Sequence, residues 1–173
     1  MSSVLGSLMV ILLSVSAYGE FISVEDFKKD QSEIKVGVFL SAVCPCSKSH
    51  VEHLNEIAKL KGVQVYGIAV DYPNEQSSKY YLDSGFTFPI VEDKNHELVK
   101  DFDALKTPQA VILKKDSGTF KSIYNGGVTS NRHFRAGAPV KTYLKDNLIA
   151  LNQGEAMPFP NGMSLGCFFS RRD

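Results

Sequence analysis

The sequence predicts an α/β fold in which a mixed central sheet is flanked by helices. Two apolar, β-branched segments, 34–41 and 63–70, have the composition of strands that are buried on both faces. Between them, the segment 46–61 gathers its apolar residues on one side at 100° per residue, as an amphipathic helix does. Later, two extended segments flank a turn at 116–118, which predicts an antiparallel hairpin.

The remaining elements complete this pattern in chain order. Glu25 and Asp26 are expected to begin a short N-terminal helix, and Gly85 suits the C-cap of a later one. Two βαβ crossovers imply that the central strands are parallel. The expected elements are a strand over 34–41, a helix over 46–61, a strand over 63–70, a helix over 74–84, an extended piece over 88–91, a brief helix around 95–103, a strand over 109–114, its hairpin partner over 120–124 and a final helix over 137–151.

Composition and charge exclude some classes of function. Hydrophobic residues make up 43% of the chain and charged residues 22%, and the 19 Lys and Arg balance the 19 Asp and Glu. A balanced chain has no general attraction for nucleic acid or anionic lipid, so no nucleic-acid partner is expected. The sequence also has no Gly-rich phosphate loop after a strand and no Gly-x-Ser-x-Gly elbow, which removes the usual arguments for nucleotide binding and for a hydrolase.

The first nineteen residues have most features of an export signal. They carry no charged side chain and contain an apolar run from Val4 to Val15. Ala17 and Gly19 stand at the −3 and −1 positions of a signal-peptidase site, where small side chains fit. The run is shorter than the roughly 20 apolar residues of a membrane span. One usual feature of a signal peptide, a positively charged n-region, is missing. A cleavable signal is expected, with an uncleaved anchor as the alternative.

This interpretation divides the chain into three parts. We expect a signal peptide over 1–19, a domain over 20–154 and an irregular, Pro- and Gly-rich C-terminal tail over 155–173 that carries Cys167. The protein would be exported to a periplasmic or extracellular location, without stable membrane insertion after cleavage. With only three cysteines in the chain, a structural disulfide framework is not indicated, and exchange chemistry fits their distribution better.

The motif Cys44-Pro45-Cys46 lies where the first long strand ends and the first long helix begins. Unpaired N–H groups at a helix N-terminus stabilise a thiolate, so a cysteine placed there is reactive at neutral pH. Pro45 has no N–H and suits the first turn of the helix. Cys44 is therefore the expected nucleophile, and the alternative is a buried, inert pair of cysteines.

The chain resembles the thioredoxin-like redoxins, which include the alkyl hydroperoxide reductase and thiol-specific antioxidant relatives. The resemblance lies in the succession of a strand, the motif Cys-Pro-x-x, an amphipathic helix and a second strand. Thr107-Pro108 resembles the cis-proline segment that faces the reactive cysteine in that superfamily, and Gly166-Cys167 resembles the end of some redoxins. The resemblance covers most of residues 34–167. It implies a three-layer thioredoxin-like sandwich, no cofactor, and a catalytic site made of Cys44, Cys46, Cys167, Thr107 and Pro108.

The sequence also departs from the patterns of this superfamily. The motif is Cys-x-Cys, and the usual second cysteine of Cys-x-x-Cys falls on Ser47. The peroxiredoxin motif has Pro seven residues before the reactive cysteine and Thr or Ser three residues before it. Ser41 matches the second position, whereas Gly37 stands at the first.

Three disulfide pairings remain open, namely 44–46, 44–167 and 46–167. A bond between residues i and i+2 has poor geometry and is easily reduced, which would suit an oxidant or isomerase, and we favour it as the resting pair. A 44–167 bond would instead join a nucleophile to a resolving cysteine on a flexible tail. Cys167 without any role is the further alternative.

The function expected from these features is that of an exported thiol-disulfide oxidoreductase acting on protein thiols or disulfides. Cys44 would attack the partner, Cys46 would resolve the mixed disulfide, and Thr107 and Pro108 would hold the partner's backbone by edge-strand hydrogen bonds. The alternative is a thiol peroxidase that takes peroxide, with Cys44 peroxidatic and Cys167 resolving.

A binding function is also considered. Cys46, His50 and His53 fall on one helix face, and sulfur with imidazole could hold Cu(I) or Zn. Sco-like copper chaperones are similar in fold and bind copper with two cysteines and a histidine. The alternative is that these histidines are packed core residues. His96 and His133 are expected to be exposed, and Asp71 is interpreted as part of a turn over 71–74, with a proton relay as its other possible role.

Overall fold

The structure is a computed structural model that describes residues 20–71 and 75–170. The expected signal peptide at 1–19, and residues 72–74 of the expected turn, lie outside the described residues. The strands are β1 (Phe21–Ile22), β2 (Ile34–Leu40), β3 (Val63–Ala69), β4 (Ile90–Glu92), β5 (Lys106–Thr107), β6 (Gln109–Asp116), β7 (Thr119–Gly127) and β8 (Cys167–Phe168). The helices are α1 (Val24–Lys29), α2 (Pro45–Ser49), α3 (Val51–Ala58), α4 (Glu75–Asp83), α5 (Glu97–Asp101) and α6 (Tyr143–Asn152).

The central sheet is mixed, as predicted. Its strand order is β1-β4-β3-β2-β6-β7, while β5 and β8 form a separate two-stranded sheet. Strand β2 runs parallel to β3 and antiparallel to β6, and β6 forms the hairpin with β7. The parallel pairs are joined through helices, in agreement with the βαβ crossovers inferred from the sequence.

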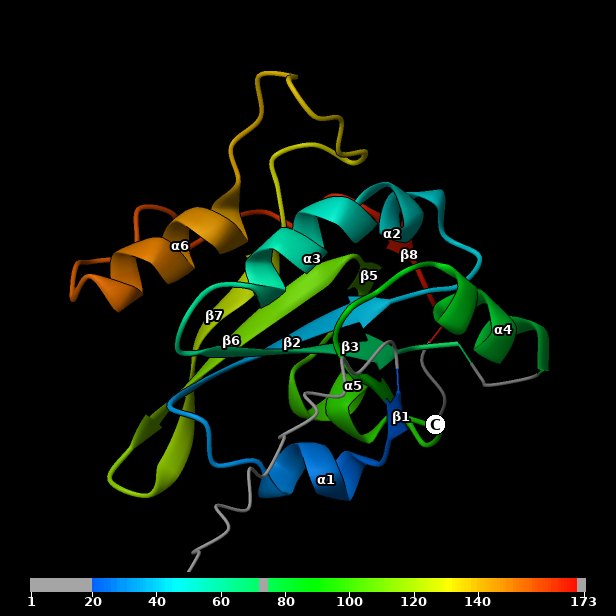
Figure 1. Cartoon of the computed structure of the whole chain (residues 1–173), viewed down its shortest axis with the longest axis horizontal. Helices are drawn as coiled ribbons and strands as arrows, with labels where there is room; N and C mark the ends of the chain where they lie inside the picture. The colour runs from blue at the N-terminus through cyan, green and yellow to red at the C-terminus, as the bar shows by residue number, and fades with distance from the viewer. Residues whose placement is uncertain (1–19, 72–74, 171–173) are drawn as a thin grey trace, which may run out of the picture.

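Alternate residues of the central strands face two separate cores. Val36, Val38 and Leu40 of β2 pack in one cluster with side chains of α3, α4 and α6, and Phe39 packs in the other with side chains of α1 and α5. Figure 1 shows the same layers, with α3 and α6 above the sheet and α1 and α5 below it. This three-layer sandwich confirms the predicted thioredoxin-like fold.

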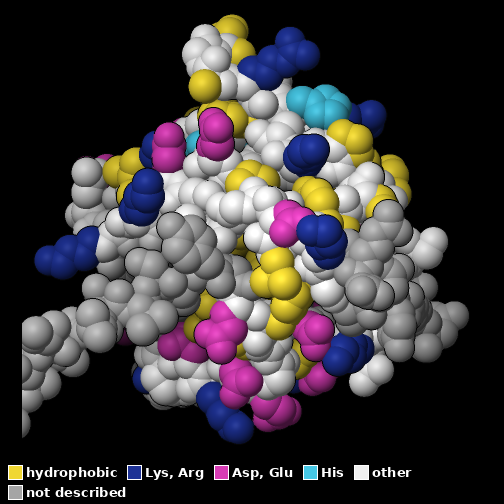
Figure 2. All heavy atoms as spheres, turned by 45° about the vertical axis from the view of Figure 1, so that its right-hand side comes forward, with side chains coloured by type: hydrophobic (Ala, Val, Ile, Leu, Met, Phe, Trp, Pro, Cys, Tyr) yellow, Lys and Arg dark blue, Asp and Glu magenta, His cyan; other side chains and the backbone are white. Residues whose placement is uncertain are grey.

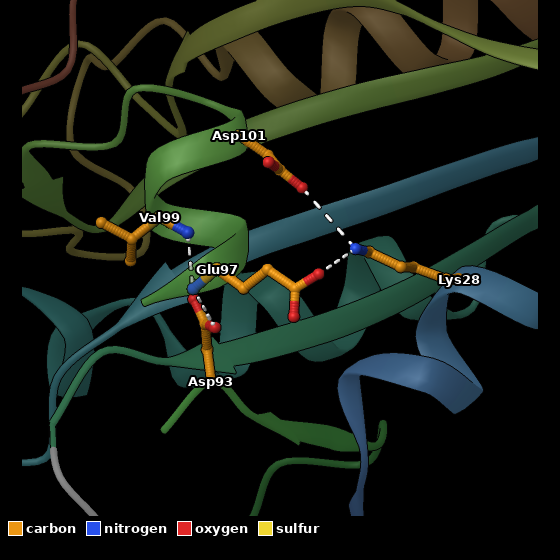
Figure 3. Close-up of polar contacts among 5 residues, drawn as sticks. All are labelled: Lys28, Asp93, Glu97, Val99 and Asp101. Carbon is orange, nitrogen blue, oxygen red and sulfur yellow. Dashed lines mark hydrogen bonds and ion pairs between the residues drawn. The ribbon is translucent and has the colours of Figure 1, made fainter. Parts of the chain in front are cut away.

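On the lower face of the sheet, Asp93 ties the start of α5 in place. Its buried carboxylate accepts hydrogen bonds from the backbone N–H of Glu97 (2.7 Å) and of Val99 (2.9 Å) (Figure 3). These bonds satisfy donors at the helix start that have no partner within the helix. Lys28 of α1 forms ion pairs with Glu97 and Asp101, so α1 and α5 are also linked to each other.

The expected continuous helix over 46–61 is wrong in one respect, because it is broken at His50 into α2 and α3. The His50 backbone N–H donates to Ser47 O (3.1 Å) instead of continuing the helical pattern to Cys46. The Cys46 carbonyl oxygen accepts instead from the His50 ring, 2.8 Å from Nδ1, and from the Ser49 hydroxyl at 2.9 Å. Side chains that compete for a helical carbonyl are a common cause of such breaks.

Other differences lie near the C-terminal half. The final helix begins at Tyr143 and not at 137, since Gly137 has a φ of +79° and Pro139 follows it. The hairpin partner is longer than expected, and its pairing with β6 shifts register between Ile112 and Leu113. Within the segment expected to be an irregular tail, residues 167–168 form strand β8.

The surface carries charges of both signs. On the face in Figure 2, Lys and Arg side chains are spread among Asp and Glu side chains, which crowd most in the lower part of the view. In residues 20–71 and 75–170, no helix combines the length and the apolar character that crossing a membrane requires.

Candidate active site

Cys44 lies at the junction predicted from the sequence, after the end of β2 and at the N-cap of α2. Pro45 occupies the first turn, where a missing N–H costs no hydrogen bond. Burial raises the pKa of the Cys44 thiol, whereas the backbone N–H groups of Ser47 and Cys46 at the start of α2 lower it. The local sequence thus places a nucleophilic side chain against free backbone donors.

Side chains that are distant in the sequence add to this effect. Burial raises the pKa of Cys44, but hydrogen bonds from Cys167, from the Thr107 side chain and from the helix amides outweigh burial and bring it to about 7. The Cys44 thiol donates a hydrogen bond to the Thr107 carbonyl oxygen at 3.4 Å, a contact that is lost when Cys44 ionises. The buried Thr107 hydroxyl makes no hydrogen bond with any described residue, so it is available to donate to the sulfur once Cys44 is ionised. At neutral pH a substantial fraction of Cys44 is therefore thiolate.

Cys167 reaches Cys44 through strand pairing. Strand β8 runs antiparallel to β5 with Cys167 opposite Thr107, next to the cis peptide bond between Thr107 and Pro108. The Cys44 and Cys167 sulfurs are 2.6 Å apart, although the two residues are 123 positions apart in the sequence. A disulfide bond is about 2.05 Å long, so this pair can close with little backbone movement.

Cys46 is the third sulfur of the cluster. Its Sγ lies 3.7 Å from that of Cys167, and the three sulfurs lie within 4.8 Å of one another. Burial, followed by the hydrogen bond with Cys167 and the charge on Cys44, raises the pKa of Cys46 to about 12. The hydrogen bond to Cys44, followed by burial, raises the pKa of Cys167. Of the three thiols, Cys44 therefore ionises first.

The turn before Cys44 is held by residues that the sequence analysis did not assign to the site. The Asp71 carboxylate accepts a hydrogen bond from Ala42 N–H, and the Tyr81 hydroxyl donates to Leu40 O at 2.8 Å. Ser47 Oγ accepts from Ser41 N–H at 3.2 Å. Asp71 follows β3 and Tyr81 lies in α4, so no motif around Cys44 could have identified them.

The histidines near the motif are packed residues. His50 places Nδ1 against Cys46 O and Nε2 2.9 Å from Thr129 Oγ1, so both ring nitrogens have partners other than sulfur. The His53 ring stacks on Phe134 at 4.4 Å. Hence the expected row of Cys46, His50 and His53 does not converge on one point; among the described residues, the group that could hold a metal ion consists of the three cysteines.

His96 is a correction to the sequence analysis. It is 2% exposed, and its Nε2 lies 2.9 Å from Val70 O, whereas it was expected to be exposed. His133 is exposed as expected. The wrong expectation came from the polar neighbours of His96 in the sequence. The backbone of His96 has a φ of +53°, and its ring is turned inward, which the neighbouring residues do not predict.

Comparisons with known proteins show which family and which structures this chain resembles. The model of the AhpC/TSA family matches residues 12–121. The thiol-disulfide oxidoreductase ResA of Geobacillus kaustophilus (strain HTA426) is 29% identical over 112 residues, which are 60% of this chain and 64% of that protein, so less than two thirds of that relative is spanned.

Two solved structures are similar over most of the chain. An uncharacterized conserved protein from Geobacillus kaustophilus has a TM-score of 0.67 and 25% identity, covering 86% of this chain and 82% of its own. A hypothetical protein from Sinorhizobium meliloti 1021 has a TM-score of 0.67 and 19% identity, with coverage of 86% and 84%. These matches extend the likeness beyond residue 121 and support a single fold for nearly the whole described chain.

Proposed function

We propose that this chain, which belongs to the AhpC/TSA family, is a thiol-disulfide oxidoreductase with Cys44 as its nucleophile. One observation carries the proposal: the thiol of lowest pKa in the cluster lies 2.6 Å from a second thiol that can form a disulfide with it. The activity named for the ResA relative points the same way. The substrates would be disulfides or thiols of partner proteins.

The reaction begins at the Cys44 thiolate. It attacks one sulfur of a partner disulfide, the S–S bond breaks, and the other partner sulfur leaves as a thiolate that takes up a proton. The Cys167 thiol then loses its proton and attacks Cys44 Sγ, which releases the second partner sulfur. The partner disulfide has gained two electrons, and the chain has lost them to a 44–167 disulfide. The reverse sequence would oxidise a partner dithiol.

Cys167 replaces Cys46 as the proposed resolving residue. From the sequence a 44–46 bond was expected, but the sulfurs of Cys44 and Cys167 lie only 2.6 Å apart, which supports the 44–167 pair instead. The pKa of both Cys46 and Cys167 is raised, so proximity to the Cys44 sulfur, and not ease of ionisation, favours Cys167 as the resolving residue. Thr107 and Pro108 are proposed, as expected from the sequence, to hold the partner's backbone beside the sulfurs.

Peptide mapping of the oxidised protein tests this assignment. After mild oxidation and proteolysis under acidic conditions, mass spectrometry should find a peptide linking Cys44 to Cys167. Cys44→Ser should abolish the reduction of insulin disulfides, Cys167→Ser should slow it, and Cys46→Ser should leave most of it. A 44–46 bond in the oxidised protein, or full activity of Cys44→Ser, would contradict the proposal.

Peroxide is the alternative oxidant for the same pair of sulfurs. A peroxidase would convert the Cys44 thiolate to a sulfenic acid, which Cys167 would then condense with to give the same disulfide and water. One equivalent of hydrogen peroxide, followed by stopped-flow detection of the loss of thiols, separates the two. A rate no greater than that of free cysteine would leave the disulfide substrate as the function.

A second candidate function is binding of a thiophilic metal ion. The observation that favours it is the compact triangle of Cys44, Cys46 and Cys167 sulfurs, since thiolates select soft ions such as Cu(I). Competition with a chromogenic Cu(I) chelator under anaerobic conditions should show one ion per chain. Each Cys→Ser change should weaken binding at least about tenfold, while His50→Ala should not. Unchanged affinity of Cys46→Ser would remove this candidate.

Export and the three-part organisation are also proposals. The uncharged apolar run and the small residues Ala17 and Gly19 support a signal peptide over 1–19, followed by a domain over 20–154 and the tail over 155–173. Expression in a bacterial host with N-terminal sequencing of the periplasmic fraction should give Glu20 as the first residue. An intact Met1 in the membrane fraction would point to an uncleaved anchor.

A further inference from the structure

The tail of the chain occupies the edge that a partner would need. We infer that β8 is a built-in substitute for the substrate strand, and that the partner is an extended polypeptide with glycine directly before its reactive cysteine. This inference rests on the proposed thiol-disulfide exchange at Cys44 and adds to it the recognition of the partner and the regulation of access.

The first support is the position of β8. Strand β5 pairs with β8 and with no other strand in the described residues. The register places Phe168 opposite Lys106 and Cys167 opposite Thr107, and Phe169 N–H donates to Leu105 O at 3.4 Å. An exposed strand edge with free N–H and C=O groups is a general site for adding an extended peptide. With the tail displaced, a partner strand can take the same backbone hydrogen bonds.

The second support is the glycine before Cys167. A Cβ added at Gly166 would overlap the carbonyl oxygen of Thr107 and come within 2.7 Å of its carbonyl carbon. Both are backbone atoms of the segment that carries the cis Thr107–Pro108 bond, so they cannot yield as a flexible side chain would. Any strand that brings its sulfur to Cys44 in this register meets the same obstacle one residue earlier. The geometry therefore selects the sequence Gly-Cys.

The third support is the nature of the contacts that hold the tail. Lys106 Nζ donates to Ser164 O at 3.1 Å and lies 4.8 Å from the centroid of the Phe168 ring, and Ser164 Oγ donates to Pro108 O at 3.1 Å. The Phe168 side chain remains 74% exposed. Phe169, directly after β8, is half-buried and packs against the core below the sheet, so this apolar contact must also break when the tail opens. The other contacts of the tail are few and polar, which favours opening.

The anchor of the tail lies a few residues earlier. Gly127 N–H donates to Gly162 O at 2.9 Å, and Gly162 packs so closely on the rings of Tyr124 and Tyr143 that a Cβ would not fit. The stretch between Gly162 and Cys167 can therefore swing away while its start stays fixed. This arrangement keeps Cys167 near the site for the resolving step.

The consequence is that the tail controls access to Cys44. The Cys44 side chain is only 3% exposed, with Cys167 against its sulfur. A partner must displace β8 to reach it, and β8 returns to release the partner. The chain thus holds its own nucleophile covered until a strand that fits better arrives.

Alkylation of Cys44 tests the control of access without any oxidoreductase assay. The reduced full-length protein is treated with iodoacetamide at pH 9, where Cys44 is ionised in all variants, and modification of Cys44 is followed by tandem mass spectrometry. Lys106→Ala and Gly166→Ala should each speed modification about three- to tenfold. Lys100→Ala, an exposed lysine of α5, is the matched control and should not. Equal rates for the wild-type protein and the three variants would overturn the inference that the tail controls access to Cys44.

Peptide substrates test the recognition of glycine. Two disulfide-linked peptides are compared, one with Gly and one with Ala directly before the reactive cysteine. The Cys167→Ser protein is used, so that the mixed disulfide at Cys44 is trapped. The Gly peptide should react at least about tenfold faster, because the Ala peptide meets the Thr107 carbonyl. Equal, rapid reaction of both would overturn the glycine rule while leaving the oxidoreductase intact. Failure of both peptides and of a small aromatic disulfide, which has no residue before its sulfur, would instead defeat the proposed function itself.

Discussion

Nδ1 of His50 lies 2.8 Å from the carbonyl oxygen of Cys46 and so takes the acceptor that the His50 amide would use in an unbroken helix. A carbonyl oxygen can only accept, so Nδ1 carries the proton. Nε2 lies 2.9 Å from Thr129 Oγ1, whose single proton is also in reach of the Asn131 carbonyl oxygen at 3.0 Å. The active-site turn, α2, is thereby tied to the segment after β7. Cys46 is held by its backbone, which leaves its sulfur free to face Cys167.

His50→Ala should destabilise the fold, because the Cys46 carbonyl and the Thr129 hydroxyl both lose a buried partner. The loss in the free energy of unfolding should be about 1–3 kcal/mol, measured by urea denaturation. His133→Ala, at an exposed histidine, is the matched control and should be nearly neutral. Equal stability of the two variants would mean that the ring of His50 contributes nothing through these contacts.

The reactivity of Cys44 should follow its ionisation. Its pKa is lowered to about 7, so the rate of alkylation should be half of its maximum near pH 7 and reach a plateau above about pH 8. Burial and its neighbours raise the pKa of Cys46 to about 12, so Cys46 should remain unmodified over the same range. A rate profile for Cys44 centred near pH 9 would show that the amides and Thr107 do not stabilise the thiolate.

Thr107→Val should weaken that stabilisation with little change in volume. Loss of the hydroxyl should move the midpoint of the Cys44 alkylation profile upward from about 7 toward about 8. Thr107→Ser keeps the hydroxyl and should restore the original midpoint. A valine variant with an unchanged profile would assign the lowered pKa to Cys167 and the helix amides.

His53 should make stability depend on pH. Burial, followed by the charges of His50 and Lys145, lowers its pKa to about 4, so the folded state takes up a proton less readily than the unfolded state. The free energy of unfolding should therefore be fully retained above about pH 6.5 and fall on acidification toward pH 4, by at most about 1.4 kcal/mol per pH unit for this residue. His53→Phe should flatten that slope in urea titrations at several pH values. An unchanged slope would assign the acid sensitivity to other groups.

Much of the site could be predicted because its key residues lie at ends of strongly patterned elements. Cys44 follows a strand that is apolar at nearly every step, and Thr107-Pro108 precedes another one. The partner of Cys44 could not be read in the same way. It depends on the path of residues 155–166, which have no periodicity, and on backbone contacts at Gly127 and Gly166 that only a folded chain makes.

Periodicity also hid some features of the fold. The apolar face of 46–61 continues across His50, so the pattern gives no sign that a side chain has captured a helical carbonyl there. Lys35 lies in a strand that was correctly expected to be buried on both faces, yet its charge had no predicted partner. The structure places its Nζ 2.8 Å from Phe27 O and 4.0 Å from the centroid of the Phe120 ring, contacts that join three separate elements.

Oxidation at Cys44 would also change the topology of the polymer. A covalent link to Cys167 would enclose nearly the whole domain in one ring, because 123 positions separate the two residues. In the chain-entropy treatment, a ring of this size raises the free energy of the unfolded chain by about 4–5 kcal/mol. The oxidised form should therefore melt at a higher temperature and resist proteases longer. The lifetime of the protein would then depend on whether Cys44 is oxidised or reduced.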